Sequence, residues 1–122
     1  MTLKISHLSL GVSDLAASER FYRDVLGLPT RRDGEDVSVQ WPDFLLLLTE
    51  KPPADRSKFH FGFRVGSSAE VDGWAERLRS NSVQIISGPA SNNGTRQLFF
   101  LDPDQYVVEI YADRLPVKRN LR

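Results

Sequence analysis

The sequence predicts an α+β protein made of two tandem βαβββ modules, because the chain repeats one pattern. A strand-like segment His-Leu-Ser-Leu-Gly-Val begins at His7, and a similar segment His-Phe-Gly-Phe-Arg-Val begins at His60, 53 positions later. At the same offset, Phe21 falls on Trp74. Each strand-like segment therefore leads into a helix-like segment with an apolar residue at a matching position.

The first module is expected over about residues 3–50. Residues 4–12 alternate apolar and polar side chains, which indicates a half-buried strand. Ser13 or Asp14 is suited to cap the helix that follows, and Gly27 stands at a typical helix C-terminus. Three short strands complete the module, and they are expected at residues 30–32, 36–40 and 44–49.

A linker over about residues 51–57, which contains Pro52-Pro53, separates this module from a second one over about residues 58–113. Its expected elements are a strand at 59–65, a helix at 69–80, three strands at 83–87, 97–101 and 106–111, and a loop at 91–94. The basic, Pro-interrupted tail 114–122 is expected to be a frayed or docking terminus. All of residues 1–122 form one domain in this interpretation.

Composition narrows the possible functions. Lys and Arg (16) balance Asp and Glu (16) without a basic run, so a nucleic acid partner is not expected. The chain has no cysteine, and any metal must therefore be held by nitrogen and oxygen ligands. The longest apolar run, residues 44–48, is too short to cross a membrane. With no secretory signal pattern at the N-terminus, a cytoplasmic protein is expected.

Strand parity selects the candidate metal ligands. Side chains alternate between the two faces of a sheet, which places His7 and Ser9 opposite the apolar face of the first strand. The same rule places His60 on the polar side of its strand and Glu109 with Tyr111 on one face of the last strand. Imidazole and carboxylate are suitable ligands for a divalent ion such as zinc, manganese, iron or nickel.

Glu109 invites two interpretations. A carboxylate within an apolar strand costs several kcal/mol, roughly, unless it is paired or bound to a metal. It is therefore either a metal ligand or the partner of Arg64 in a metal-free ion pair. The other residues expected to contact a substrate are Arg64, Gln97, Phe99 and Tyr111.

Four segments carry a resemblance to a known family. They are His7-Leu-Ser-Leu-Gly-Val-Ser-Asp-Leu, Phe21-Tyr-Arg-Asp-Val-Leu-Gly-Leu, His60-Phe-Gly-Phe-Arg-Val and Leu101-Asp-Pro-Asp-Gln-Tyr-Val-Val-Glu-Ile. On these segments the chain resembles the vicinal oxygen chelate superfamily, which includes glyoxalases, bleomycin-resistance proteins, extradiol dioxygenases and fosfomycin-resistance metallotransferases. The resemblance spans about residues 5–112 and implies a curved, half-barrel mixed sheet.

The resemblance also implies a site. The metal ligands of the family fall on His7, His60 and Glu109, around one divalent ion (Zn, Mn, Fe, Ni or Co). Glyoxalases of this kind use a fourth ligand, usually Glu, and the matching position here is Leu47 or a neighbour. Ser9 falls where fosfomycin transferases carry a hydroxyl that helps to polarise the substrate, which makes it the expected catalytic residue.

Function follows from the same resemblance as an expectation. The chain is expected to be a metal-dependent glyoxalase-like enzyme whose small substrate chelates the ion through adjacent oxygens, with lyase, isomerase, transferase or dioxygenase chemistry. The alternative is a non-catalytic resistance protein of the bleomycin-binding type, which sequesters a drug or metabolite. A homodimer in which modules pair between chains is expected, without a membrane partner.

Overall fold

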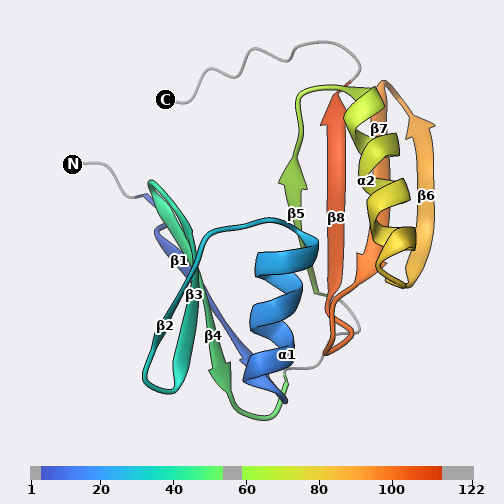
Figure 1. Cartoon of the computed structure of the whole chain (residues 1–122). Helices are drawn as coiled ribbons and strands as arrows, with labels where there is room; N and C mark the ends of the chain where they lie inside the picture. The colour runs from blue at the N-terminus through green and yellow to red at the C-terminus, as the bar shows by residue number, and fades with distance from the viewer. Residues whose placement is uncertain (1–3, 54–58, 114–122) are drawn as a thin grey trace. The chain divides into compact units, whose positions relative to one another are not determined.

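The computed structural model describes residues 4–53 and 59–113, which form two units. The first unit contains the described residues up to 53 together with residues 103–105. The second contains residues 59–102 and 106–113. Each unit has a four-stranded sheet and a helical segment (Figure 1). The tail 114–122 and most of the expected linker lie outside the described residues.

The sheet of the first unit has the strand order β1-β4-β3-β2. Strands β1 and β4 are parallel, and the other neighbours are antiparallel. The helix α1 continues directly into a π-helical segment, η1. The bounds of these elements are β1 (His7–Val12), α1 (Leu15–Arg20), η1 (Phe21–Val25), β2 (Thr30–Asp33), β3 (Asp36–Trp41) and β4 (Phe44–Glu50).

Local sequence explains where the helical segment begins and ends. Asp14 caps α1, since its side chain accepts a hydrogen bond from Ala17 N at 3.1 Å. Gly27 follows the segment with φ of 70°, a left-handed conformation that glycine adopts without a Cβ clash. The buried apolar side chains lie between helix and sheet: Leu10, Val12, Leu15, Phe21, Tyr22, Leu26, Val37, Val39, Leu46 and Leu48. The first strand begins at His7 rather than at the expected residue 4.

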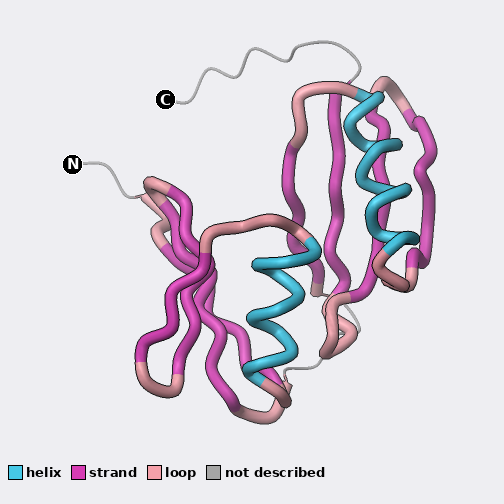
Figure 2. The backbone as a smooth tube through the Cα atoms, viewed as in Figure 1, coloured by secondary structure: helices cyan, strands magenta, loops and turns pink. Residues whose placement is uncertain are grey.

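The second unit repeats this topology, with strand order β5-β8-β7-β6 and a parallel pair formed by β5 and β8. The alternation of helices and strands along the chain can be followed in Figure 2. The expectation of two tandem βαβββ modules is confirmed. The bounds are β5 (His60–Arg64), α2 (Ser68–Ser80), β6 (Ile85–Asn92), β7 (Thr95–Leu101) and β8 (Val107–Asp113).

Helix α2 covers one face of this sheet and leaves the other face, which carries His60 and Glu109, uncovered. Ser67 caps the helix by accepting a hydrogen bond from Glu70 N. Val71, Ala75 and Leu78 are buried at the helical spacing that the sequence predicts. The buried side chains of β7 and β8 lie on the helix face: Leu98, Phe100, Val108, Ile110 and Ala112.

Strand β6 is longer than the sequence suggests. It was expected to end near Ser87 with a loop over 91–94, but it pairs with β7 as far as Asn92. The pairing shifts register twice, on either side of Ser87, which lets the strand continue past Gly88-Pro89. Only Asn93-Gly94 forms the turn, with φ of 50° and 82°. Among the described residues, no helix has the length and apolar character to cross a bilayer.

The connection between β7 and β8 contains one conformationally unfavourable residue. The Asp102 carboxylate accepts a hydrogen bond from Tyr106 N at 2.9 Å and holds the connection closed. Gln105 has φ of 67°, in the left-handed region that disfavours a residue with a Cβ.

Replacing this residue tests whether the strain is real. Gln105→Gly removes from the folded state a left-handed conformational cost of about 1–2 kcal/mol. The glycine also gives the unfolded chain more conformational entropy, which opposes folding by up to about 1 kcal/mol. We expect a gain of roughly 0.5–1 kcal/mol in the free energy of unfolding, measured by urea denaturation. Gln84→Gly is the control, because Gln84 has no positive φ and the same replacement should destabilise the protein there. Equal losses for both variants would contradict the explanation.

Candidate functional site

His60 and Glu109 face each other on the sheet face of the second unit that α2 does not cover. The parallel pairing of β5 with β8 places Gly62 opposite Glu109, and His60 is two residues before Gly62 on the same face. His60 Nε2 lies 3.6 Å from Glu109 Oε1, which is too long for a hydrogen bond. The His60 side chain is 54% exposed and that of Glu109 is 18% exposed. Both groups are therefore open to a ligand from the solvent side.

The geometry of the pair fits two ligands of one divalent ion. Metal–nitrogen and metal–oxygen bonds of about 2.0–2.2 Å, meeting at a tetrahedral angle, would separate the two ligand atoms by about 3.4 Å. The observed separation of 3.6 Å is close to this value. A neutral imidazole nitrogen and a carboxylate oxygen are also the donor types that such ions accept.

All four residues expected to contact a substrate lie on the same sheet face as this pair by register. Phe99 is directly opposite Glu109, and its ring meets the His60 ring edge-on with centroids 5.7 Å apart. Tyr111 is opposite Gln97 on β7 and Arg64 on β5. Because directly paired residues share a face, all of these side chains belong to the uncovered face of the second unit.

Arg64 does not form the alternative ion pair with Glu109. Its Nη2 lies 2.6 Å from Asp113 Oδ2, and the two side chains form an ion pair. The interpretation of Glu109 as the partner of Arg64 is therefore wrong, since the side chain that faces Glu109 is His60. Asp113 was not expected at this face from the sequence, although it has the same parity as Glu109 and Tyr111 in β8.

In the first unit, His7 and Ser9 are exposed on the face opposite the buried side chains of β1. Ser6 Oγ and His7 Nδ1 lie within hydrogen-bonding distance, 3.2 Å apart. Ser9 is paired with Leu47 on β4, just as Gly62 is paired with Glu109 on β8. Leu47 is therefore the topological counterpart of Glu109, which agrees with the position assigned to the absent fourth ligand.

The described residues contain no group of three or more His, Asp or Glu side chains in a metal-binding arrangement. The close pair of the second unit consists of two of the three residues expected as ligands from the sequence. His7 belongs to the first unit.

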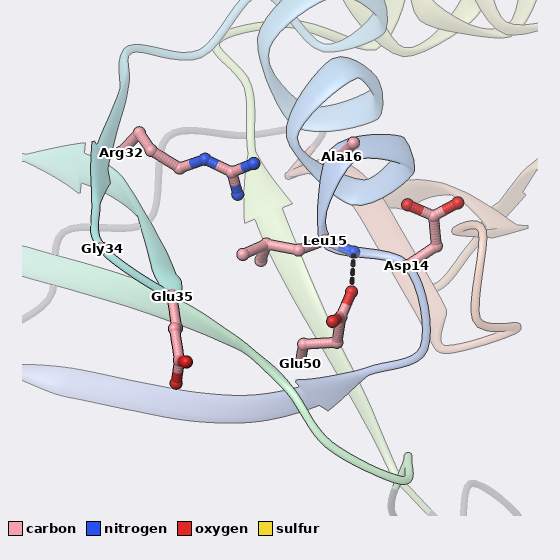
Figure 3. Close-up of a pocket in the computed structure, with 7 residues that line it drawn as sticks. All are labelled: Asp14, Leu15, Ala16, Arg32, Gly34, Glu35 and Glu50. Carbon is pink, nitrogen blue, oxygen red and sulfur yellow. Dashed lines mark hydrogen bonds between the residues drawn. The ribbon is translucent and has the colours of Figure 1, made fainter.

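A pocket elsewhere in the first unit has a structural explanation. It encloses about 410 Å³ and lies at the start of α1, where the Glu50 carboxylate accepts a hydrogen bond from Leu15 N at 3.2 Å (Figure 3). That carboxylate satisfies a backbone donor which the first turn of a helix leaves unpaired. None of the expected site residues lines the pocket, whose lining is Asp14, Leu15, Ala16, Arg32, Gly34, Glu35 and Glu50.

Comparisons with known proteins agree with the sequence and the fold. The chain is 28% identical over 118 residues to the metallothiol transferase FosB of Staphylococcus epidermidis, which covers 91% of this chain and 84% of that protein. It is 28% identical over 115 residues to a manganese-dependent 2,3-dihydroxybiphenyl 1,2-dioxygenase of Geobacillus genomosp. 3, covering 90% of this chain and 36% of that protein.

Structural similarity extends over almost the whole chain. The crystal structure of the fosfomycin resistance protein FosX from Listeria monocytogenes has a TM-score of 0.81 to this structure. The two are 23% identical, over 94% of this chain and 100% of that one, which shows a common fold. A family model described as Glyoxalase/Bleomycin resistance protein/Dioxygenase superfamily matches residues 4–110. The chain belongs to this superfamily.

Proposed function

We propose that this protein is a divalent-metal-dependent glyoxalase-like enzyme whose small substrate chelates the ion through adjacent oxygens. The observation that carries the proposal is the His60–Glu109 pair, which lies at ligand spacing on an open sheet face without a hydrogen bond between its members. The names of two relatives, a metallothiol transferase and a manganese-dependent dioxygenase, support a dependence on metal.

In this proposal His7 is the third ligand. It is the first residue of β1, as His60 is the first residue of β5, and both histidines are exposed on the uncovered face of their sheet. Two imidazoles and one carboxylate leave coordination positions free for a substrate. The bound ion would act as a Lewis acid that polarises a substrate oxygen.

The other side chains of the two faces would bind and orient the substrate. Ser9 Oγ–H would donate a hydrogen bond to a substrate oxygen on which negative charge develops. Phe99 and Tyr111 would contact the apolar part of the substrate. Gln97 and the ion-paired Arg64 would offer hydrogen-bond donors at the far end of the face. The reaction belongs to the lyase, isomerase, transferase or dioxygenase classes.

A second candidate is a binding protein that sequesters a drug or metabolite without turnover. The observation in its favour is the presence of Phe99 and Tyr111, both half-buried, on the uncovered face, where they could hold a planar ligand. This function requires neither a metal nor the His60–Glu109 pair. We therefore rank it below the enzyme.

Metal binding is the first prediction of the proposed function. The wild-type protein is expected to bind one equivalent of a divalent ion, measured by elemental analysis after dialysis. His60→Ala and Glu109→Gln should lose the ion and keep their circular dichroism, because neither side chain lies in the core. Glu76→Gln, which removes an exposed carboxylate of α2, is the control and should bind the ion normally. Full occupancy in His60→Ala would refute the site.

The second prediction concerns assembly. We propose a homodimer in which His7 of one chain completes the site of the other chain. A His7→Ala chain mixed and refolded with a His60→Ala chain should then regenerate one intact site per heterodimer. If each site forms within a single chain, the mixture should bind no metal, because every chain lacks one ligand. A monomer in sedimentation at micromolar concentration would also contradict the arrangement.

The third prediction separates enzyme from binding protein. Ser9 lies about 6.5 Å along the strand from His7 and on the same face. Ser9→Ala should keep the metal and lose about 10²-fold in turnover, because it removes a donor to the charge that develops in the transition state. Candidate substrates are thiol adducts of α-oxo aldehydes, catechols and epoxides. Tight binding of a planar antibiotic without metal or turnover would instead support the sequestering protein.

A further inference from the structure

We propose that Gly62 and Phe99 are positioning residues that direct the Glu109 carboxylate toward His60. This inference rests on the proposed metal site and concerns the side chains that shape it. The three residues Gly62, Glu109 and Phe99 form one row across β5, β8 and β7. The row therefore has no side chain on one flank of Glu109 and an aromatic ring on the other.

Gly62 makes room for the acid. A Cβ built on Gly62 would lie 3.0 Å from both the Cβ and the backbone oxygen of Glu109. Real Cβ atoms seldom approach so closely, so an added methyl group would push β8 or the base of the Glu109 side chain away. Gly62 has no positive φ. Close approach to Glu109, rather than backbone conformation, is thus the reason for glycine at this position.

Phe99 closes the opposite flank. It is directly paired with Glu109, so its ring occupies the β7 side of the acid. Strands β5 and β7 are second neighbours, about 9.6 Å apart, yet the His60 and Phe99 rings meet at 5.7 Å. The two rings therefore reach toward each other above β8. This contact restrains the imidazole and leaves the β5 side as the open direction for the Glu109 carboxylate.

The first unit provides an internal comparison. Its equivalent row across β1, β4 and β3 consists of Ser9, Leu47 and Ser38. That row has neither a glycine nor an aromatic ring, and the central acid is replaced by leucine. The same topology therefore folds without the small and large flanking residues. In the second unit, Gly62 and Phe99 occur together with Glu109. The βαβββ sheet itself does not require them.

The test uses the full chain and Mn²⁺ alone. Gly62→Ala should weaken Mn²⁺ binding 10–100-fold, the usual effect of disturbing the groups that orient a ligand. The dissociation constant is measured by electron paramagnetic resonance of free Mn²⁺, and the metal-free melting temperature is recorded in parallel. Gly73→Ala is the matched control, because a Cβ on Gly73 meets nothing within 4 Å. This control should bind Mn²⁺ as tightly as the wild type.

A second pair of variants keeps the proposal falsifiable if Gly62→Ala fails to fold. Phe99→Ala should weaken Mn²⁺ binding, and Phe99→Tyr should restore it because the ring is retained. If Gly62→Ala or Phe99→Ala lowers only the melting temperature and keeps the wild-type affinity, the residue is structural and its positioning role is refuted. If the wild type itself binds no Mn²⁺ or other divalent ion, the proposed function fails and this inference fails with it.

Discussion

The parallel pairing of the first and last strand in each module is the constraint on which the rest of the structure depends. In the second unit it pairs β5 with the start of β8, so that residues 47 positions apart in sequence, such as Gly62 and Glu109, become lateral neighbours. The helix must then cover one face of the sheet, and the apolar residues of alternate positions turn toward it. The other face carries the remaining positions, among them His60, Glu109, Phe99 and Tyr111. His60 and Glu109 can therefore be both exposed to a ligand and fixed by a rigid sheet.

Strand and helix patterns in the sequence predicted most of this architecture because their signals are local. Alternating parity in β1 and β8 correctly separates the buried side chains from the uncovered ones, and in β5 it separates half-buried positions from exposed ones. The helix caps at Asp14 and Ser67 coincide with short polar residues before an apolar periodic run. Strand β6 was the exception. The dipeptide Gly88-Pro89 is typical of the end of a strand, but the hydrogen-bonded pairing of β6 with β7 continues past it through two register shifts.

The candidate site was only partly predictable from the sequence. Strand parity predicts on which face of a sheet a residue lies, but only the pairing of the strands shows which residues are its neighbours. Glu109 could be placed on a face from the sequence, but an ion pair with Arg64 stayed open as an alternative to the metal site with His60. The register resolved the choice, since Arg64 lies opposite Tyr111 and reaches Asp113 instead. Likewise, the glycine at position 62 carries no sequence signal of its function. Its meaning depends on the distance between two strands, which no periodicity within one strand encodes.

The difference between Leu47 and Glu109 has an electrostatic consequence for the proposed chemistry. A divalent ion held by two neutral imidazoles and one carboxylate carries a formal charge of about +1, whereas a second carboxylate at position 47 would reduce it to zero. A net positive centre attracts anionic oxygens more strongly and polarises them further. Leu47 also places an apolar side chain, instead of a carboxylate, on the uncovered face of the first unit, where it is paired with Ser9. In the proposed site, the ion would favour a substrate that brings its own negative oxygens. Leu47 and Ser9 would offer that substrate an apolar surface and a hydroxyl donor.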